Sequence, residues 1–227
     1  MLRVSVVFVL RALVRSEWRM VRLRVELERT RLANRVDVAP PLIAQQLLVS
    51  GEDHRHARHP GFDLFAIGRA LWRRVAHGSR EGASTIEQQV VRTITGRYER
   101  TLRRKLKEIL LAILVAQSFP KEILPSVYLQ IAYYGWRMNG YQQACQRLGL
   151  HPSSLALDEA AGLVARLKYP EPRTAPSTRT LQIGYRTEHL LGLYRRHVHE
   201  GNYRHLNGKT VCNRASAHAA TEPIPER

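Results

Sequence analysis

A run of leucine and isoleucine at helical spacing, within residues 98–119, is the feature that most limits how this chain can fold. Positions 102, 106, 109, 110, 113 and 114 are all leucine or isoleucine. Residues three and four apart lie on one side of an α-helix, so the pattern predicts a long helix from about Tyr98 to Phe119. Its second half is almost entirely apolar, which indicates that this half is buried within the fold.

The rest of the chain also predicts helices. Apolar periodicity favours helices over residues 41–49, 64–76, 85–92, 121–134, 140–149, 155–167 and 183–200. Asp63, Ser84 or Thr85, and Ser153 or Ser154 are suitable N-caps, and Glu87 follows Ser84 at the spacing of a capping box. No segment shows sustained strand alternation, so we expect a mainly α fold.

The N-terminal 40 residues form a basic amphipathic segment. Apolar positions at 7, 10, 14, 18, 21, 25 and 32 make a stripe, and arginines fill the other faces. Such a helix either packs on the domain or lies on an anionic membrane with Trp18 at the interface. The apolar run 1–10 is shorter than a membrane-spanning helix requires.

Proline and composition divide the chain into three parts. Pro40-Pro41 marks the end of the N-terminal segment, 1–40, and the proline-punctuated stretch 169–180 follows the last predicted core helix. We therefore expect a domain over 41–172. A region over 173–227 would contain a linker, a short helix docked on the domain and, from about Gly201, a tail of disordered composition.

Charge points to an anionic partner. Lys and Arg number 36 against 19 Asp and Glu, a net charge of +17, which suits nucleic acid, anionic lipid or a phosphorylated substrate. No nucleic-acid motif or aromatic stacking pattern accompanies the charge, so nucleic acid is not the expected partner. Cys145 and Cys212 lack metal-type or CxxC spacing and are expected to be free thiols.

Residues 47–108 contain acidic, basic and amide side chains of the kinds that an active site uses. Glu52 and Glu108 bracket a segment with arginines, a Pro-Gly turn and the sequence GASTIEQQVVR at 82–92. Arg100, Arg104 and Glu108 are four residues apart and would share one side of a helix. His54, His56 and His59 lack further acid or thiol spacing, so the sequence does not predict a metal site there.

Several segments in order resemble the motifs of the peptidoglycan glycosyltransferases, glycosyltransferase family fifty-one. EDHRHARHPGFD (52–63) is similar to the first motif, GASTIEQQVVR to the second, RTLRRKLKE (100–108) to the third and KEILPSVYLQIAYYG (121–135) to the fourth. A fifth is echoed in residues 140–165. The resemblance covers about residues 41–172. It implies a lysozyme-like helical glycosyltransferase domain that polymerises a lipid-linked disaccharide-pentapeptide into glycan strands.

The resemblance also assigns roles to residues. Glu52 matches the general base that takes a proton from the acceptor hydroxyl, and Glu108 matches an acid that assists departure of the lipid pyrophosphate. A divalent cation, Mg²⁺ or Mn²⁺, is the cofactor that this chemistry would admit near Glu108. Residues on family positions that bind substrate are Asp53, Arg69, Ser84, Thr85, Gln89, Arg92 and Arg100. Arg92 stands where the family carries lysine.

The family further implies a place and partners for the chain. We expect the outer face of the cytoplasmic membrane, the lipid-linked precursor and growing strand as ligands, an anionic membrane surface, and cell-wall synthesis proteins. The chain ends about 55 residues after the last motif, which predicts a monofunctional enzyme. No full-length membrane-spanning helix of the family's kind is visible in the sequence.

Four positions depart from the family pattern, and they keep other functions open. His56 replaces phenylalanine, Glu87 threonine, Gln130 asparagine and Thr93 asparagine. One alternative is a relative that binds the lipid-linked precursor or a cell-wall partner without turnover. A lytic hydrolase is a second alternative, but it has no need of cations that bind pyrophosphate.

Overall fold

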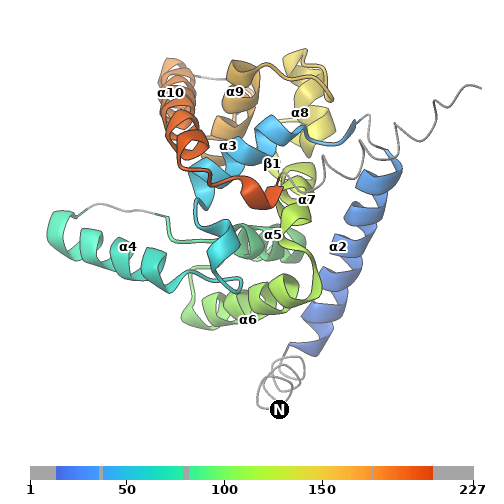
Figure 1. Ribbon diagram of the computed structural model, residues 1–227, viewed down its shortest axis with the longest axis vertical. Helices are drawn as coiled ribbons and strands as arrows, with labels where there is room; N and C mark the ends of the chain where they lie inside the picture. The colour runs from blue at the N-terminus through green and yellow to red at the C-terminus, as the bar shows by residue number, and fades with distance from the viewer. Residues whose placement is uncertain (1–13, 36–37, 79–81, 175, 207–227) are drawn as a thin grey trace, which may run out of the picture.

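The computed structural model describes residues 14–35, 38–78, 82–174 and 176–206. The described elements are, in order, α2 (Arg15–Asn34), α3 (Leu42–Glu52), η2 (His56–Arg58), α4 (Leu64–His77), α5 (Ile86–Thr95), α6 (Leu102–Ser118), η3 (Lys121–Ile123), α7 (Leu124–Ile131), β1 (Tyr133–Gly135), β2 (Met138–Asn139), α8 (Tyr141–Leu148), α9 (Leu157–Lys168) and α10 (Ser177–His199). The expected mainly α fold is confirmed. Figure 1 shows α3, α8, α9 and α10 gathered at one end and α4, α5 and α6 at the other, with α7 between them.

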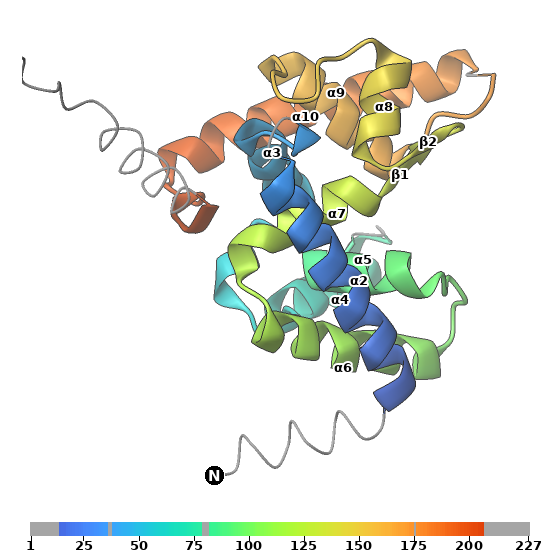
Figure 2. The ribbon, with the colours of Figure 1, turned by 90° about the vertical axis from the view of Figure 1, so that its right-hand side faces the viewer.

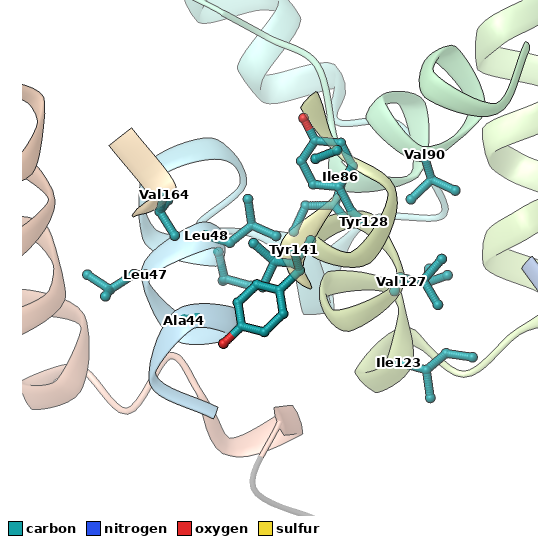
Figure 3. Packing of buried hydrophobic residues seen from close by; sticks show 14 of the residues in the cluster. Ala44, Leu47, Leu48, Ile86, Val90, Ile123, Val127, Tyr128, Tyr141 and Val164 are labelled. Carbon is teal, nitrogen blue, oxygen red and sulfur yellow. The ribbon is translucent and has the colours of Figure 1, made fainter. Parts of the chain in front are cut away.

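The core lies where α3, α5 and α7 meet. Leu47 and Leu48 of α3, Ile86 of α5 and Leu124 of α7 are completely buried. Figure 3 shows side chains from these helices packed together with Tyr141 of α8 and Val164 of α9. Each buried leucine or isoleucine contributes about 1.5–3 kcal/mol to stability, so this contact fixes the relative positions of the helices that carry the polar motifs.

The second half of helix α6 is buried, as its apolar sequence indicates, but the first half is not. Leu111 and Leu114 are buried, but Leu102 is 84% exposed and Leu106 62% exposed. The helix also begins later than predicted, at Leu102, because Thr101 acts as N-cap and accepts a hydrogen bond from the Arg104 amide at 3.2 Å. Its N-terminal half therefore presents apolar side chains outward.

Helix α2 packs on the domain. Trp18, Val21 and Val25 are buried in contacts with α5, α6 and α7, and Figure 2 shows the helix running across the front of these elements. Trp18 is therefore covered by the helices of the domain. Residues 7 and 10 of the expected stripe lie outside the described residues.

The C-terminal segment belongs to the same packed body. Helix α10 begins at Ser177, earlier than expected, and contacts α9 and α3. After it, Tyr203 and Leu206 are only 4% exposed, and the Tyr203 hydroxyl is hydrogen-bonded to Ser50. The expectation of a disordered tail starting at Gly201 is thus wrong as far as residue 206, and residues 207–227 lie outside the described part.

A short hairpin interrupts the predicted helix 121–134. Helix α7 ends at Ile131, and β1 pairs with β2 and bridges to Glu171. Gly135, at φ +147°, permits the bridge because a Cβ there would lie 2.3 Å from the Glu171 carbonyl oxygen. The sequence did not predict the hairpin, because strands of three and two residues are too short to show an alternation of apolar and polar residues.

The structure decides between the predicted caps. Thr85, one of the two residues predicted to cap α5, accepts from the Gln88 amide at 3.3 Å, so Glu87 does not form a capping box with Ser84. Ala156 rather than a serine precedes α9, and the Glu159 carboxylate accepts from the Ala156 amide at 2.8 Å. Asp63 caps α4 as predicted, accepting from Phe65 and Ala66 amides.

Among the described residues, no single helix combines the length and apolar composition that crossing a membrane requires; the bent pair 102–118 and 121–131 meets that requirement by length and composition only.

Candidate active site

Glu52 is the last residue of α3, and its side chain is partly open to solvent, at 19% exposure. Its two carboxylate oxygens have different partners. Gln89 of α5 donates its side-chain amide to Oε2 at 3.0 Å. Arg186 of α10 donates Nη2 to Oε1 at 2.9 Å, and the same nitrogen donates to the Gly51 carbonyl at 2.8 Å. Three helices thus hold one partly exposed carboxylate.

Arg186 was not identified from the sequence. It lies 134 residues from Glu52, in a helix for which the sequence predicted docking but no particular contact. Gly51 is what lets the two helices approach, because a Cβ there would lie 2.4 Å from Leu190 Cδ2 and 2.9 Å from Arg186 Nη2. A glycine next to a candidate catalytic acid was the only local signal of this close packing.

Glu108 of α6 is buried, with 2% of its side chain exposed, and three cations surround it. Arg92 of α5 binds both carboxylate oxygens through Nε and Nη2, each at 3.0 Å. Lys105 donates Nζ to Oε1 at 2.8 Å, and Arg104 donates to Oε2. Burial would raise the pKa of Glu108, but Arg92 and Lys105 hold it below its ordinary value. The acid is therefore a buried anion that gathers cations.

The polar residues of α5 connect the two acids. Gln89 contacts Glu52 and Arg92 contacts Glu108, and residues three apart lie on one face of a helix, about 4.5 Å along its axis. Ser84, just before the helix, accepts from Arg92 Nη2 at 3.0 Å and from Lys105 Nζ at 3.4 Å. Glu52 and Glu108 are therefore both bound by side chains from one face of α5.

Asp53 and Thr85 support this arrangement from inside. The carboxylate of Asp53 is 3.0 Å from His59 Nε2 and accepts from the Ile86 amide at 3.1 Å. Thr85 donates to the Gly61 carbonyl at 2.7 Å. Burial would raise the pKa of Asp53, but the imidazoles of His56 and His59 hold it well below its usual range. Both residues tie the loop after α3 to the start of α5.

Two of the predicted substrate residues are exposed. Arg69 is exposed on α4, and Arg100 is exposed just before α6. Because α6 begins at Leu102, Arg100 does not share a helical face with Arg104 and Glu108. Lys105 takes that place beside Glu108, because residues three apart share a helical face just as residues four apart do.

The described residues contain one group with the donors of a metal site, formed by Asp53, His56, His59 and Glu87. His54, which the sequence places beside them, is exposed and stacks on His197 instead. At Glu108 both carboxylate oxygens already accept from cationic side chains. A divalent ion bound to Glu108 therefore does not fit the donors of this arrangement.

Known proteins resemble this chain over the segment that contains these residues. The family model described as Transglycosylase matches residues 20–193. Penicillin-binding protein 1A of Neisseria gonorrhoeae is 36% identical over 132 residues, which cover 57% of this chain and 16% of that protein. Penicillin-binding protein 1F of Bacillus subtilis (strain 168) is 33% identical over 132 residues, which cover 57% of this chain and 18% of that protein.

Penicillin-binding protein 1A of Aquifex aeolicus (strain VF5) is 40% identical over 124 residues, 54% of this chain and 17% of that protein. The chain spans less than a fifth of the length of these relatives. The family match covers well over half of this chain and includes both acids and Arg186. The chain therefore belongs to the transglycosylase family, in agreement with the motifs in its sequence.

Proposed function

We propose that this chain is a peptidoglycan glycosyltransferase that joins lipid-linked disaccharide-pentapeptide units into glycan strands. The observation that carries the proposal is the pairing along α5 of a partly exposed acid with a cation-rich buried acid. Glycosyl transfer from a lipid pyrophosphate needs both groups: one to take a proton and one to receive a departing diphosphate.

Glu52 is the base of the proposed reaction. The acceptor hydroxyl gives its proton to this carboxylate while its oxygen bonds to the anomeric carbon of the donor. The bond from that carbon to the pyrophosphate oxygen breaks on the opposite face, which inverts the configuration and gives a β-1,4 link. Gln89 and Arg186 orient the carboxylate, and its 19% exposure leaves it accessible to an acceptor.

The cluster around Glu108 receives the leaving group. Arg92, Arg104 and Lys105 carry three positive charges against one negative charge on Glu108, an excess of two. A lipid pyrophosphate carries about two negative charges, so the cluster complements it. Glu108 holds the cations in place before substrate arrives, and fixed cations stabilise charge that develops in the transition state.

Exposed apolar side chains support the proposed membrane location. Leu64, Phe65, Trp72 and Val75 of α4 and Leu102 and Leu106 of α6 are each at least 62% exposed. Figure 1 shows α4 extending from the end of the molecule that contains α6. Together with arginines on the same helices, this surface suits the headgroup region of an anionic bilayer, where a lipid-linked substrate resides.

The test is polymerisation of fluorescent lipid-linked disaccharide-pentapeptide by the purified chain in detergent or vesicles. We expect a ladder of glycan products with the wild type and loss of at least a hundredfold in rate with Glu52→Gln, which keeps the shape but not the base. Equal rates for both proteins would refute the assignment of Glu52.

A matched binding measurement separates the main alternative. A relative that binds without turnover would bind the lipid-linked precursor and give no ladder. In that case Arg92→Gln should still weaken precursor binding, because its guanidinium contributes to the pyrophosphate charge match. Release of short fragments from finished glycan strands would instead indicate a lytic hydrolase.

A further inference from the structure

Two residues that set this chain apart from the pattern of its family meet inside the protein. His56 and Glu87 are completely buried, and His56 Nδ1 is 3.6 Å from Glu87 Oε1. The residues found at these positions in the family pattern, phenylalanine and threonine, carry no charge. Neither His56 nor Glu87 takes part in the proposed transfer reaction, so their joint burial calls for another explanation.

The donor atoms around them are spaced as metal ligands. Asp53, His56, His59 and Glu87 each offer one donor atom, all within 4.8 Å of one another. His56 Nδ1 is 3.5 Å from Asp53 Oδ2 and 3.6 Å from Glu87 Oε1, which is longer than a good hydrogen bond. Bonds of about 2.0–2.1 Å to a tetrahedral Zn²⁺ separate neighbouring ligands by roughly 3.4 Å.

The orientation of His56 also matches a metal ligand. Its Nε2 lies 3.0 Å from the backbone carbonyl oxygen of Lys121, which can only accept, so Nε2 carries the proton. Nδ1 then faces the two carboxylates, and a divalent ion would take the place of any proton it carries. Metal-binding histidines characteristically donate their second nitrogen to a carbonyl or carboxylate in this way.

Buried polar atoms of the cluster lack hydrogen-bond partners. Among the described residues, neither His56 Nδ1 nor Glu87 Oε2 has one, although both side chains are completely buried. A buried polar atom left unsatisfied costs about 1–3 kcal/mol. An ion bound between the two side chains removes that cost for both.

We propose that Asp53, His56 and Glu87 bind a divalent transition-metal ion, with His59 as the partner that orients Asp53. His59 fits this outer role because its Nδ1 accepts from the Gly61 amide at 3.3 Å, so its Nε2 donates to Asp53. One imidazole and two carboxylates suit Zn²⁺ better than Mg²⁺, because nitrogen is a poor ligand for Mg²⁺. The ion would join the loop after α3 to α5, directly behind Glu52.

Lys121 is the competitor for the same space. Its ammonium is 2.8 Å from Glu87 Oε1 and donates to the His56 carbonyl at 2.6 Å. It neutralises only one of the two carboxylates, and its side chain is 20% exposed, so it can turn toward solvent when an ion enters. This site is independent of the proposed transfer reaction and can be tested without substrate.

The experiment uses the full chain without an affinity tag, stripped with EDTA and dialysed against micromolar ZnCl₂, with MgCl₂ in parallel. Elemental analysis should find one Zn²⁺ per chain and no Mg²⁺. Glu87→Gln and His56→Phe should lower Zn²⁺ affinity at least tenfold. His54→Gln is the matched control, because His54 is exposed and outside the cluster, and it should bind as the wild type does.

Absence of stoichiometric Zn²⁺ in the wild type, or equal binding by wild type and both cluster variants, would overturn the proposal and assign any bound ion to surface histidines. Lys121→Gln guards against variants that fail to fold, since it removes the competitor and no ligand. It should tighten Zn²⁺ binding several-fold, and unchanged affinity would count against a site at this position.

Discussion

Replacing Glu108 by glutamine should destabilise the protein, although glutamine has the same shape. The change leaves Arg92, Arg104 and Lys105 together without their anion. Removing one partner of a buried ion pair costs about 3–5 kcal/mol. The three cations are 28%, 16% and 33% exposed, so water can partly solvate them, and we expect the lower end, about 3 kcal/mol.

For a domain of this size that loss lowers the melting temperature by about 6–12 °C. Thermal unfolding followed by circular dichroism or calorimetry measures it, with Glu99→Gln as control because Glu99 is exposed just before α6. Added salt should reduce the loss, since screening weakens repulsion among the cations. A second replacement, Arg104→Gln, should recover part of it. A loss below about 1 kcal/mol would refute a cluster that depends on Glu108.

Three further predictions follow from contacts between distant segments. Gly51→Ala should cost about 1–3 kcal/mol of stability, measured by urea unfolding, because its Cβ would collide with Leu190; unchanged stability would contradict the close packing. Arg186→Gln should lower kcat/KM about tenfold to a hundredfold in the polymerisation assay, mostly through kcat, with partial recovery in Arg186→Lys; a change confined to KM would indicate substrate binding rather than orientation of the base. The hydrogen bond from Lys107 lowers the pKa of Glu17 to about 2, against about 4.3 in an unfolded chain. Its contribution to stability is therefore complete above about pH 4.3 and lost as the pH falls toward 2, so the melting temperatures of wild type and Glu17→Gln should differ at pH 7 and converge near pH 2.

Much of the candidate site could be predicted because its residues lie in short motifs. Gln89 and Arg92 share a helical face by their spacing alone, and each contacts one of the two acids. The roles of these residues in catalysis stay predictions, but their neighbourhood follows from helical geometry. The family was predicted from the same motifs and the mainly α fold from apolar periodicity, and both are confirmed.

The contacts that sequence reasoning missed depend on tertiary packing. Arg186 reaches Glu52 only because α10 folds back onto α3, and no periodicity within either helix encodes that contact. Glu87 matched a capping box by spacing, yet Thr85 caps the helix and leaves Glu87 free to turn inward toward His56. The capping rule predicted the start of the helix as the partner of Glu87, whereas in the folded protein its neighbour is His56.

The two halves of α6 differ for a related reason. The apolar second half is buried as predicted, whereas Leu102 and Leu106, which continue the same stripe in the first half, are 84% and 62% exposed. An apolar stripe shows only that water is unfavourable there, and it does not say whether protein or lipid covers it. Exposed apolar residues on the neighbouring α4 make lipid the more consistent cover, which is the environment that the proposed substrate requires.

Helix α5 explains why these features depend on one another. Glu87 faces the buried histidines, Gln88 accepts from Lys105 at 2.6 Å, Gln89 contacts Glu52 and Arg92 contacts Glu108. Successive residues turn by about 100° around a helix, so one short segment contacts the buried histidine and both acids. A shift of the helix by one residue would break all these contacts together. The buried cluster behind Glu52 and the cation cluster around Glu108 are therefore fixed by the same element, and whatever stabilises the start of α5 also sets the relative positions of the two acids.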